Sequence, residues 1–150
     1  MDLEGLYQEI ILDHYKHPRG KGELTSPLAE VHHVNPTCGD EITVQIATDP
    51  AGHLLVGYQG LGCSISQASA SVMSELVNGN SIEVAETARA AFVDMMHAQG
   101  AGEPNEEILG DGIAFAGVAK YPARVKCALL PWMALRDAQI QANLAESEEG

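Results

Sequence analysis

The chain has 150 residues, 45% of them hydrophobic, and a formal net charge of −13. This length suits a single domain over residues 1–150, with an acidic tail that we expect to be frayed from about residue 144. The excess of acidic groups excludes nucleic acid and anionic membranes as favoured partners, because both carry the same sign of charge. No apolar run reaches the roughly 20 residues of a membrane helix, and no secretory segment opens the chain, so we expect a cytoplasmic protein.

The first half of the chain predicts one helix and then three strands. Apolar residues recur at helical spacing from Leu3 to His14, and Pro18 should end this helix because the residue before a proline is pushed out of the helical region. Alternating apolar and polar residues then predict three strands, over residues 29–33, 42–46 and 54–58. The turn sequence at residues 49–52 should join the last two strands as an antiparallel hairpin.

The second half of the chain predicts three helices. Their periodicity places them over residues 65–76, 82–97 and from residue 121 towards the acidic tail. Asn80 or Ser81 should cap the second helix, and the polar, glycine-containing residues 100–112 should form a loop. The order of elements predicts an α+β domain, with a small three-stranded antiparallel sheet and helices packed on one face of it.

Pro131 falls inside the last predicted helix. In a regular helix the N–H that proline lacks would bond the carbonyl group of Cys127. We therefore predict a distortion in the turn from Cys127 to Pro131: either the helix begins close to Pro131, or it bends there.

The three cysteines, Cys38, Cys63 and Cys127, suggest a metal site. Their odd number and the lack of an export signal argue against a disulfide framework. Cys38 and Asp40 flank a flexible glycine, and thiolate and carboxylate groups are both known zinc ligands. Two of the cysteines lie in glycine-rich connections beside predicted strands, where loops can present ligands at one end of a scaffold. Our hypothesis is that Cys38, Asp40, Cys63 and Cys127 bind one zinc ion.

Core packing is the alternative interpretation of the cysteines. Their separations match no short zinc-finger pattern, and a free cysteine is most often a small core residue, which suits Cys127. Three thiolates and a carboxylate around zinc would leave a negative site that attracts cations. Arg124 and Lys126 are the nearest basic residues to Cys127, although both could equally belong to a solvated helix face.

Other chemistry finds little support in the sequence. The six histidines are expected to be mostly at the surface or partly packed. Metalloprotease, nucleotide-binding, serine-hydrolase and zinc-deaminase motifs are all missing from the sequence.

Several stretches nevertheless resemble one family. They are Cys38-Gly39-Asp40, residues 60–66, residues 121–127, and Asp13-His14-Tyr15-Lys16 with Pro18-Arg19. From about Leu3 to Leu135 the chain resembles the U-type iron–sulfur cluster assembly family, which includes IscU, SufU and the N-terminal part of NifU. The residue before the third cysteine is histidine in IscU-type scaffolds and Lys126 here, and this difference, with the long segment between Cys63 and Cys127, favours the SufU branch.

This resemblance implies both a fold and a function. The fold would be SufE/IscU-like, and the function that of a zinc-dependent sulfurtransferase. Such a protein takes persulfide sulfur from a SufS-type cysteine desulfurase and passes it to the SufBCD assembly machinery. By motif match Cys38, Asp40, Cys63 and Cys127 would be the zinc ligands, Cys38 the sulfur acceptor and Arg124 a catalytic residue beside it. The alternative function is that of a scaffold on which an iron–sulfur cluster is built.

Overall fold

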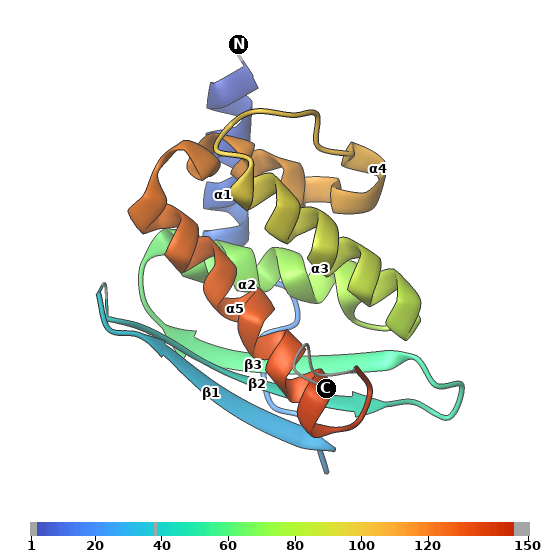
Figure 1. Cartoon of the computed structure of the whole chain (residues 1–150). Helices are drawn as coiled ribbons and strands as arrows, with labels where there is room; N and C mark the ends of the chain where they lie inside the picture. The colour runs from blue at the N-terminus through green and yellow to red at the C-terminus, as the bar shows by residue number, and fades with distance from the viewer. Residues whose placement is uncertain (1–2, 38, 146–150) are drawn as a thin grey trace.

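The computed structural model describes residues 3–37 and 39–145. Figure 1 shows a helical layer above a small sheet. The elements in chain order are α1 (Leu3–Lys16), β1 (Ala29–Asn35), β2 (Asp40–Thr48), β3 (Leu54–Leu61), α2 (Ser64–Val77), α3 (Ile82–His97), α4 (Glu106–Leu109), the 3-10 helix η1 (Gly110–Lys120) and α5 (Pro122–Gln141).

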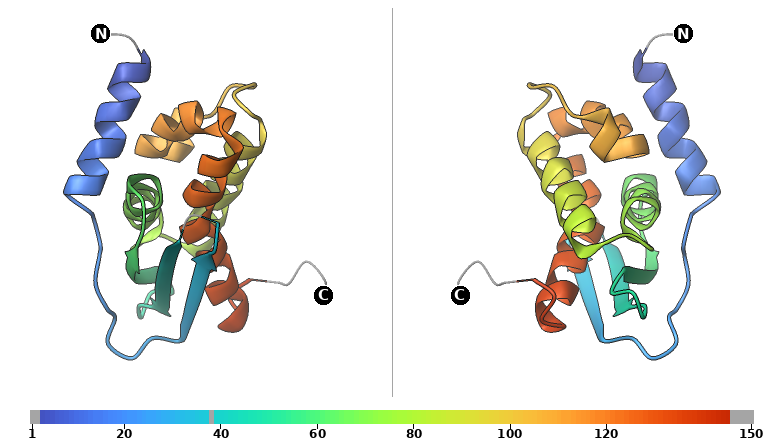
Figure 2. Two further views of the ribbon diagram at one scale, coloured as in Figure 1. Left: turned by 90° about the vertical axis from the view of Figure 1, so that its left-hand side faces the viewer. Right: turned by 90° about the vertical axis from the view of Figure 1, so that its right-hand side faces the viewer.

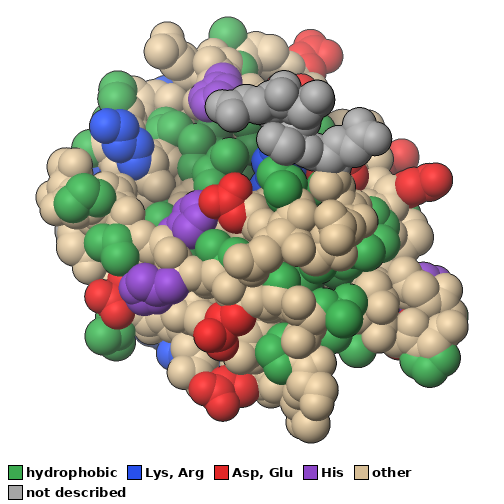
Figure 3. Space-filling view, turned by 60° about the horizontal axis from the view of Figure 1, so that its bottom comes forward, with side chains coloured by type: hydrophobic (Ala, Val, Ile, Leu, Met, Phe, Trp, Pro, Cys, Tyr) green, Lys and Arg blue, Asp and Glu red, His purple; other side chains and the backbone are tan. Residues whose placement is uncertain are grey.

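The three strands form an antiparallel sheet in the order β1-β2-β3, as the sequence predicted. Val31, Val44 and Tyr58 lie side by side in its register. Along each strand, apolar side chains on one face of the sheet alternate with side chains on the other face. The helices α2 and α5 cover the apolar face (Figure 1). Histidine and acidic side chains are prominent on the opposite side of the molecule (Figure 3). The predicted α+β class, with helices on one face of the sheet, is confirmed.

The connection between α1 and β1 passes along the sheet before it enters β1 (Figure 2). The N–H of Gly22 donates to the carbonyl of Tyr58 at 2.9 Å, and the N–H of Leu24 donates to Gln45 Oε1 at 2.7 Å. A Cβ atom at Gly57 would lie 2.7 Å from the carbonyl oxygen of Gly22, so only glycine permits this close approach. The connection is therefore packed against the sheet and helps to fix α1.

Helix α5 is joined to α3 by an aromatic contact and to α2 by hydrogen bonds. Trp132 is fully buried, and its ring stacks on Phe92 with the centroids 4.8 Å apart. The Trp132 indole N–H donates to Ser69 Oγ at 3.2 Å, and the Ser69 hydroxyl donates to the carbonyl of Ala128 at 2.6 Å. These contacts hold the first half of α5, which carries Cys127, in a fixed position against α2.

Pro131 lies inside α5 and does not begin it. The helix starts at Pro122, where proline suits the first helical position, and continues to Gln141. Of the two alternatives, a helix start close to Pro131 is therefore wrong, and the predicted start near residue 121 is confirmed. Burial of Trp132 and its neighbours and the Ser69 contact to Ala128 support the helix through this point. A bend between Cys127 and Pro131 stays a prediction.

The predicted helices and their caps agree with the structure, while one predicted loop does not. Ser81 caps α3 by accepting a hydrogen bond from the N–H of Val84. Residues 106–109 form α4 and residues 110–112 begin η1, so the expected loop over residues 100–112 is wrong in its second part. Burial of Leu109 and Phe115 stabilises these short helices, which the periodicity of the sequence does not predict.

The end of the chain is described only as far as residue 145. Leu144 packs against the core, and its N–H donates to the carbonyl of Gln139 at 2.7 Å. The predicted fraying stays a prediction for residues 146–150, which lie outside the described residues. Over the described ranges, none of the helices combines the length and the apolar character needed to cross a membrane.

Candidate metal centre

Three elements bring a carboxylate and two thiols together. Asp40 is the first residue of β2, Cys63 directly precedes α2, and Cys127 lies in the second turn of α5. One ligand atom of each residue lies within 4.8 Å of the ligand atoms of the other two. These residues are 23 or more positions apart in the chain. The structure thus supports convergence of Asp40, Cys63 and Cys127, which the sequence alone left open.

Asp40 is fully buried, with no exposed surface. Its Oδ1 accepts a hydrogen bond from the backbone N–H of Cys63 at 2.7 Å, and the Cys63 thiol lies 3.3 Å from Oδ2. The first contact orients the carboxylate, and the second brings one thiol beside it. Because a buried carboxylate needs a charge-stabilising partner, this arrangement suits a cation at the same place.

Cys63 stands where β3 turns into α2. Its backbone is extended, with φ −71° and ψ 167°, and the Ser66 hydroxyl donates to its carbonyl at 3.1 Å. The thiol is exposed, in contrast to Cys127, and lies at the N-terminus of a 14-residue helix. The partial positive charge of a helix N-terminus favours anionic ligands such as thiolate and carboxylate.

Gly62 makes room for the Asp40 carboxylate. A Cβ atom at this position would lie 2.3 Å from Asp40 Oδ1 and 2.9 Å from Ser66 Oγ, and the backbone φ of +154° is rarely adopted by other residues. Any larger residue would therefore have to displace Asp40.

Gly62→Ala is expected to weaken zinc binding by about 10-fold to 100-fold, the range found when a group that orients a metal ligand is removed. The measurement is competition with a chromophoric zinc chelator. Gly117→Ala is the matched control, because a Cβ atom at Gly117 would meet nothing within 4 Å. Equal zinc affinity in both variants would show that Asp40 does not depend on the space at Gly62.

Cys127 is 6% exposed, with its thiol 3.5 Å from the carbonyl oxygen of Ala123 in the preceding turn. Core packing, the alternative interpretation for this residue, therefore describes its burial correctly. It does not account for the two other donors that lie beside the thiol.

The donors fit a zinc ion. In a tetrahedral site with ligand bonds of about 2.0–2.3 Å, neighbouring ligand atoms lie about 3.5 Å apart, and the 3.3 Å between Cys63 Sγ and Asp40 Oδ2 is close to that value. Soft thiolates select zinc, Cu(I) or iron–sulfur clusters over magnesium and calcium. Asp40, Cys63 and Cys127 could therefore hold zinc, with one position left for a fourth ligand.

The structure does not test the roles of the two predicted catalytic residues, Cys38 and Arg124. Cys38 lies outside the described residues, and its proposed roles as ligand and acceptor stay predictions. Its described neighbours form a tight turn in which the N–H of Gly39 donates to the carbonyl of Asn35 at 2.9 Å. Arg124 lies one helical turn before Cys127 and is exposed, with its guanidinium 5.1 Å from the centre of the Tyr121 ring. The structure thus puts Arg124 on the helix that bears a donor, and its catalytic role stays a prediction.

Two supporting residues were not anticipated as part of this centre. Gly62 and Ser66 lie in a sequence stretch that resembles the family, but the residues themselves carry no metal ligand. The signal available was the glycine immediately before a candidate ligand at a strand-to-helix turn.

Comparison with known proteins agrees with the fold and identifies a family. The family model described as NifU-like N terminal domain matches residues 6–128. The chain is 45% identical to the zinc-dependent sulfurtransferase SufU of Bacillus subtilis, over 99% of this chain and 96% of that protein. It is 40% identical to the iron–sulfur cluster assembly scaffold protein IscU of Streptococcus pyogenes, over 91% of this chain and 84% of the relative.

Solved structures give the same result. The N-terminal part of a nitrogen-fixing NifU-like protein from Brucella abortus matches with a TM-score of 0.81 and 27% identity, covering 94% of this chain and 96% of that one. Together with the family match over residues 6–128, this shows that the chain belongs to the NifU-like N-terminal domain family of iron–sulfur cluster assembly proteins.

Proposed function

We propose that the protein is a zinc-dependent sulfurtransferase of iron–sulfur cluster assembly. It accepts persulfide sulfur from a SufS-type cysteine desulfurase and delivers it to the SufBCD machinery. The observation that carries the proposal is the convergence of Asp40, Cys63 and Cys127 in a chain similar over almost its whole length to a zinc-dependent sulfurtransferase. Cys38, two residues before Asp40, is the fourth ligand and the sulfur acceptor.

Zinc, when bound, keeps its cysteine ligands deprotonated at neutral pH. Asp40, Cys63 and Cys127 serve as the fixed donors, because they lie at the start of β2, directly before α2 and within α5, respectively. In the sequence Cys38 stands between β1 and β2, directly before Gly39, whose φ of +74° is a conformation that favours glycine. We assign the exchange between ligand and nucleophile to Cys38, because the other three donors are attached to regular elements.

The transfer is a thiol–persulfide exchange that needs no oxidant. The Cys38 thiolate attacks the outer sulfur of the desulfurase persulfide, a new S–S bond forms, and the existing S–S bond breaks. The desulfurase cysteine leaves as a thiolate and Cys38 becomes the persulfide. Arg124, one turn from Cys127 on an exposed helix face, supplies a positive charge towards the anionic sulfur that arrives with the partner.

A second function is favoured by one relative. The Streptococcus pyogenes protein is named an iron–sulfur cluster assembly scaffold, and the same thiolates could hold a cluster. Lys126 favours transfer over the scaffold function, because the resemblance to the family implies a histidine at this place in IscU-type scaffolds.

The deciding experiment compares metal content with desulfurase turnover. Sulfur transfer predicts a colourless protein with about one zinc ion per chain that raises the alanine-forming turnover of a SufS-type desulfurase. Anaerobic purification that instead gives a brown protein with acid-labile sulfide, and no effect on turnover, would favour the scaffold and contradict the transfer proposal.

A further inference from the structure

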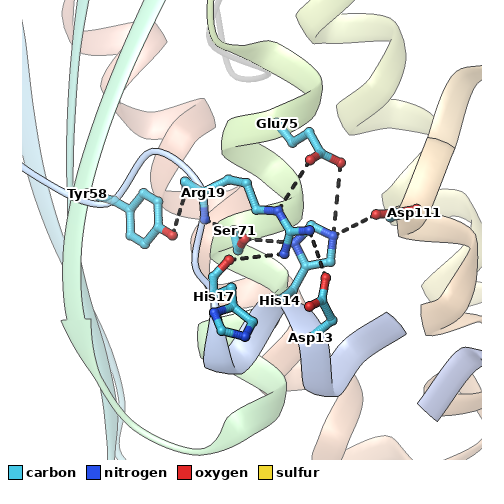
Figure 4. A network of polar contacts seen from close by, with 8 residues as sticks. All are labelled: Asp13, His14, His17, Arg19, Tyr58, Ser71, Glu75 and Asp111. Carbon is cyan, nitrogen blue, oxygen red and sulfur yellow. Dashed lines mark hydrogen bonds and ion pairs between the residues drawn. The ribbon is translucent and has the colours of Figure 1, made fainter. Parts of the chain in front are cut away.

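A second cluster of potential metal ligands lies where α1, α2 and η1 meet (Figure 4). His14 of α1 is fully buried, against the expectation that the histidines lie mostly at the surface or are partly packed. Its Nε2 is 2.8 Å from Asp111 Oδ2 and 4.0 Å from Glu75 Oε1. The three ligand atoms lie within 4.8 Å of one another, and none of these residues belongs to the cysteine centre.

The imidazole ring is held from its other side. His14 Nδ1 lies 2.7 Å from the Ser71 hydroxyl, which also accepts a hydrogen bond from the backbone N–H of Arg19 at 2.9 Å. A hydroxyl can either donate to Nδ1 or accept from it. Ser71 is therefore compatible with either tautomer of the ring. If Nε2 bound a metal ion, the ring proton would lie on Nδ1 and Ser71 could accept it, which is how metal-binding histidines are oriented.

The charges around the ring are unbalanced. Arg19 donates to the Asp13 carboxylate at 2.7 Å, and this hydrogen bond lowers the pKa of Asp13, so that pair is neutral overall. The Arg19 Nε reaches Glu75 only at 3.5 Å and on Oε2, which leaves Oε1 directed at His14. Glu75 and Asp111 therefore bring two negative charges to one imidazole nitrogen, a set that a divalent cation would neutralise.

The surrounding hydroxyl groups are neutral and fix the backbone. Burial raises the pKa of Tyr58 to about 12, against smaller opposite effects of Ser71 and Arg19. Its hydroxyl donates to the carbonyl of Arg19 at 2.9 Å, which holds the connection after α1 in place (Figure 4). The Asp13-His14 and Pro18-Arg19 stretch is thus anchored independently of any bound ion.

We propose that His14, Glu75 and Asp111 form a second metal site, for a first-row divalent ion such as Mn²⁺ or Fe²⁺. Imidazole with two carboxylates is a donor set of borderline hardness, distinct from the thiolate-rich cysteine centre. Ligand atoms about 2.0–2.2 Å from such an ion lie about 3.0–3.4 Å apart, and the observed 2.8 Å and 4.0 Å bracket that spacing. The carboxylates of Glu75 and Asp111 are 42% and 43% exposed, so an ion can enter from solvent and keep water ligands.

The test uses zinc-loaded full-length protein titrated with Mn²⁺, because Mn²⁺ prefers oxygen and nitrogen donors and does not compete well for thiolates. Electron paramagnetic resonance of free Mn²⁺ gives the number of bound ions and their affinity. We expect one Mn²⁺ per chain in the wild type, and at least about 10-fold weaker binding in Glu75→Gln and in Asp111→Asn.

Asp13→Asn is the matched control, since it removes the same unit of charge from the same network but no ligand. It should bind Mn²⁺ within about 3-fold of the wild type. Lack of Mn²⁺ binding by the wild type, or equal losses in all three variants, would overturn the proposal and leave a metal-free ion-pair cluster. The two ligand variants alter part-exposed carboxylates, so circular dichroism should show native helix content in each.

Discussion

Replacement of Cys38 by alanine is expected to reduce sulfur acceptance by at least about 1,000-fold, the order of loss that follows removal of a covalent nucleophile. Asp40, Cys63 and Cys127 would remain as donors within 4.8 Å of one another, so the variant should still bind zinc, although more weakly. The measurement is turnover of a SufS-type desulfurase, together with mass-spectrometric detection of the persulfide on this protein after alkylation.

The matched comparison is Cys63→Ala. In the wild type the Cys63 thiol lies 3.3 Å from the Asp40 carboxylate, and Cys63 directly precedes a helix that packs in the core, so we assign Cys63 a ligand role. This variant should lose zinc and also lose activity, whereas Cys38→Ala should lose activity while it retains metal. Full sulfur acceptance by Cys38→Ala would refute the assignment of Cys38 and, with it, the transfer chemistry proposed above.

Removal of zinc is expected to lower the free energy of unfolding by about 3–4 kcal/mol when the wild type has been kept at a free zinc concentration of about 100–1,000 times its dissociation constant. The ion would hold β2, α2 and α5 together through Asp40, Cys63 and Cys127, and the unfolded chain does not hold those donors in place. Urea unfolding followed by circular dichroism, with zinc and with excess chelator, measures the difference.

The Asp40→Asn variant separates the contribution of zinc to the free energy of unfolding from the contribution of the hydrogen bond to Cys63. The amide oxygen can still accept from the N–H of Cys63, but the charge that favours the cation is removed. The variant should differ from the wild type mainly in zinc-containing buffer, and the two should be similar in chelator. A zinc effect of the same size in both proteins would show that Asp40 is not a ligand.

Local signals in the sequence were enough for most of the secondary structure. The period-two strands and the capped helix from Ile82 to His97 follow from side-chain alternation and from Ser81, which are short-range effects. Residues 106–120 were not predictable in this way, because α4 and η1 depend on burial of Leu109 and Phe115 against other elements. Pro131 left open whether the helix begins close to it or bends there, and the packing of Trp132 on Phe92 supports a helix that runs through the proline.

Residue type was enough to name the candidate metal ligands, and short motifs were enough to show which family the chain resembles. The sequence by itself determined that three cysteines and Asp40 had zinc-binding chemistry and that the fold would be α+β. Only the tertiary structure decided that Asp40, Cys63 and Cys127 converge, because the contacts between β2, α2 and α5 are long-range. The tertiary structure also places His14 beside Glu75 and Asp111. The sequence does not predict this cluster, because the spacing of residues along a chain does not specify which helices pack together.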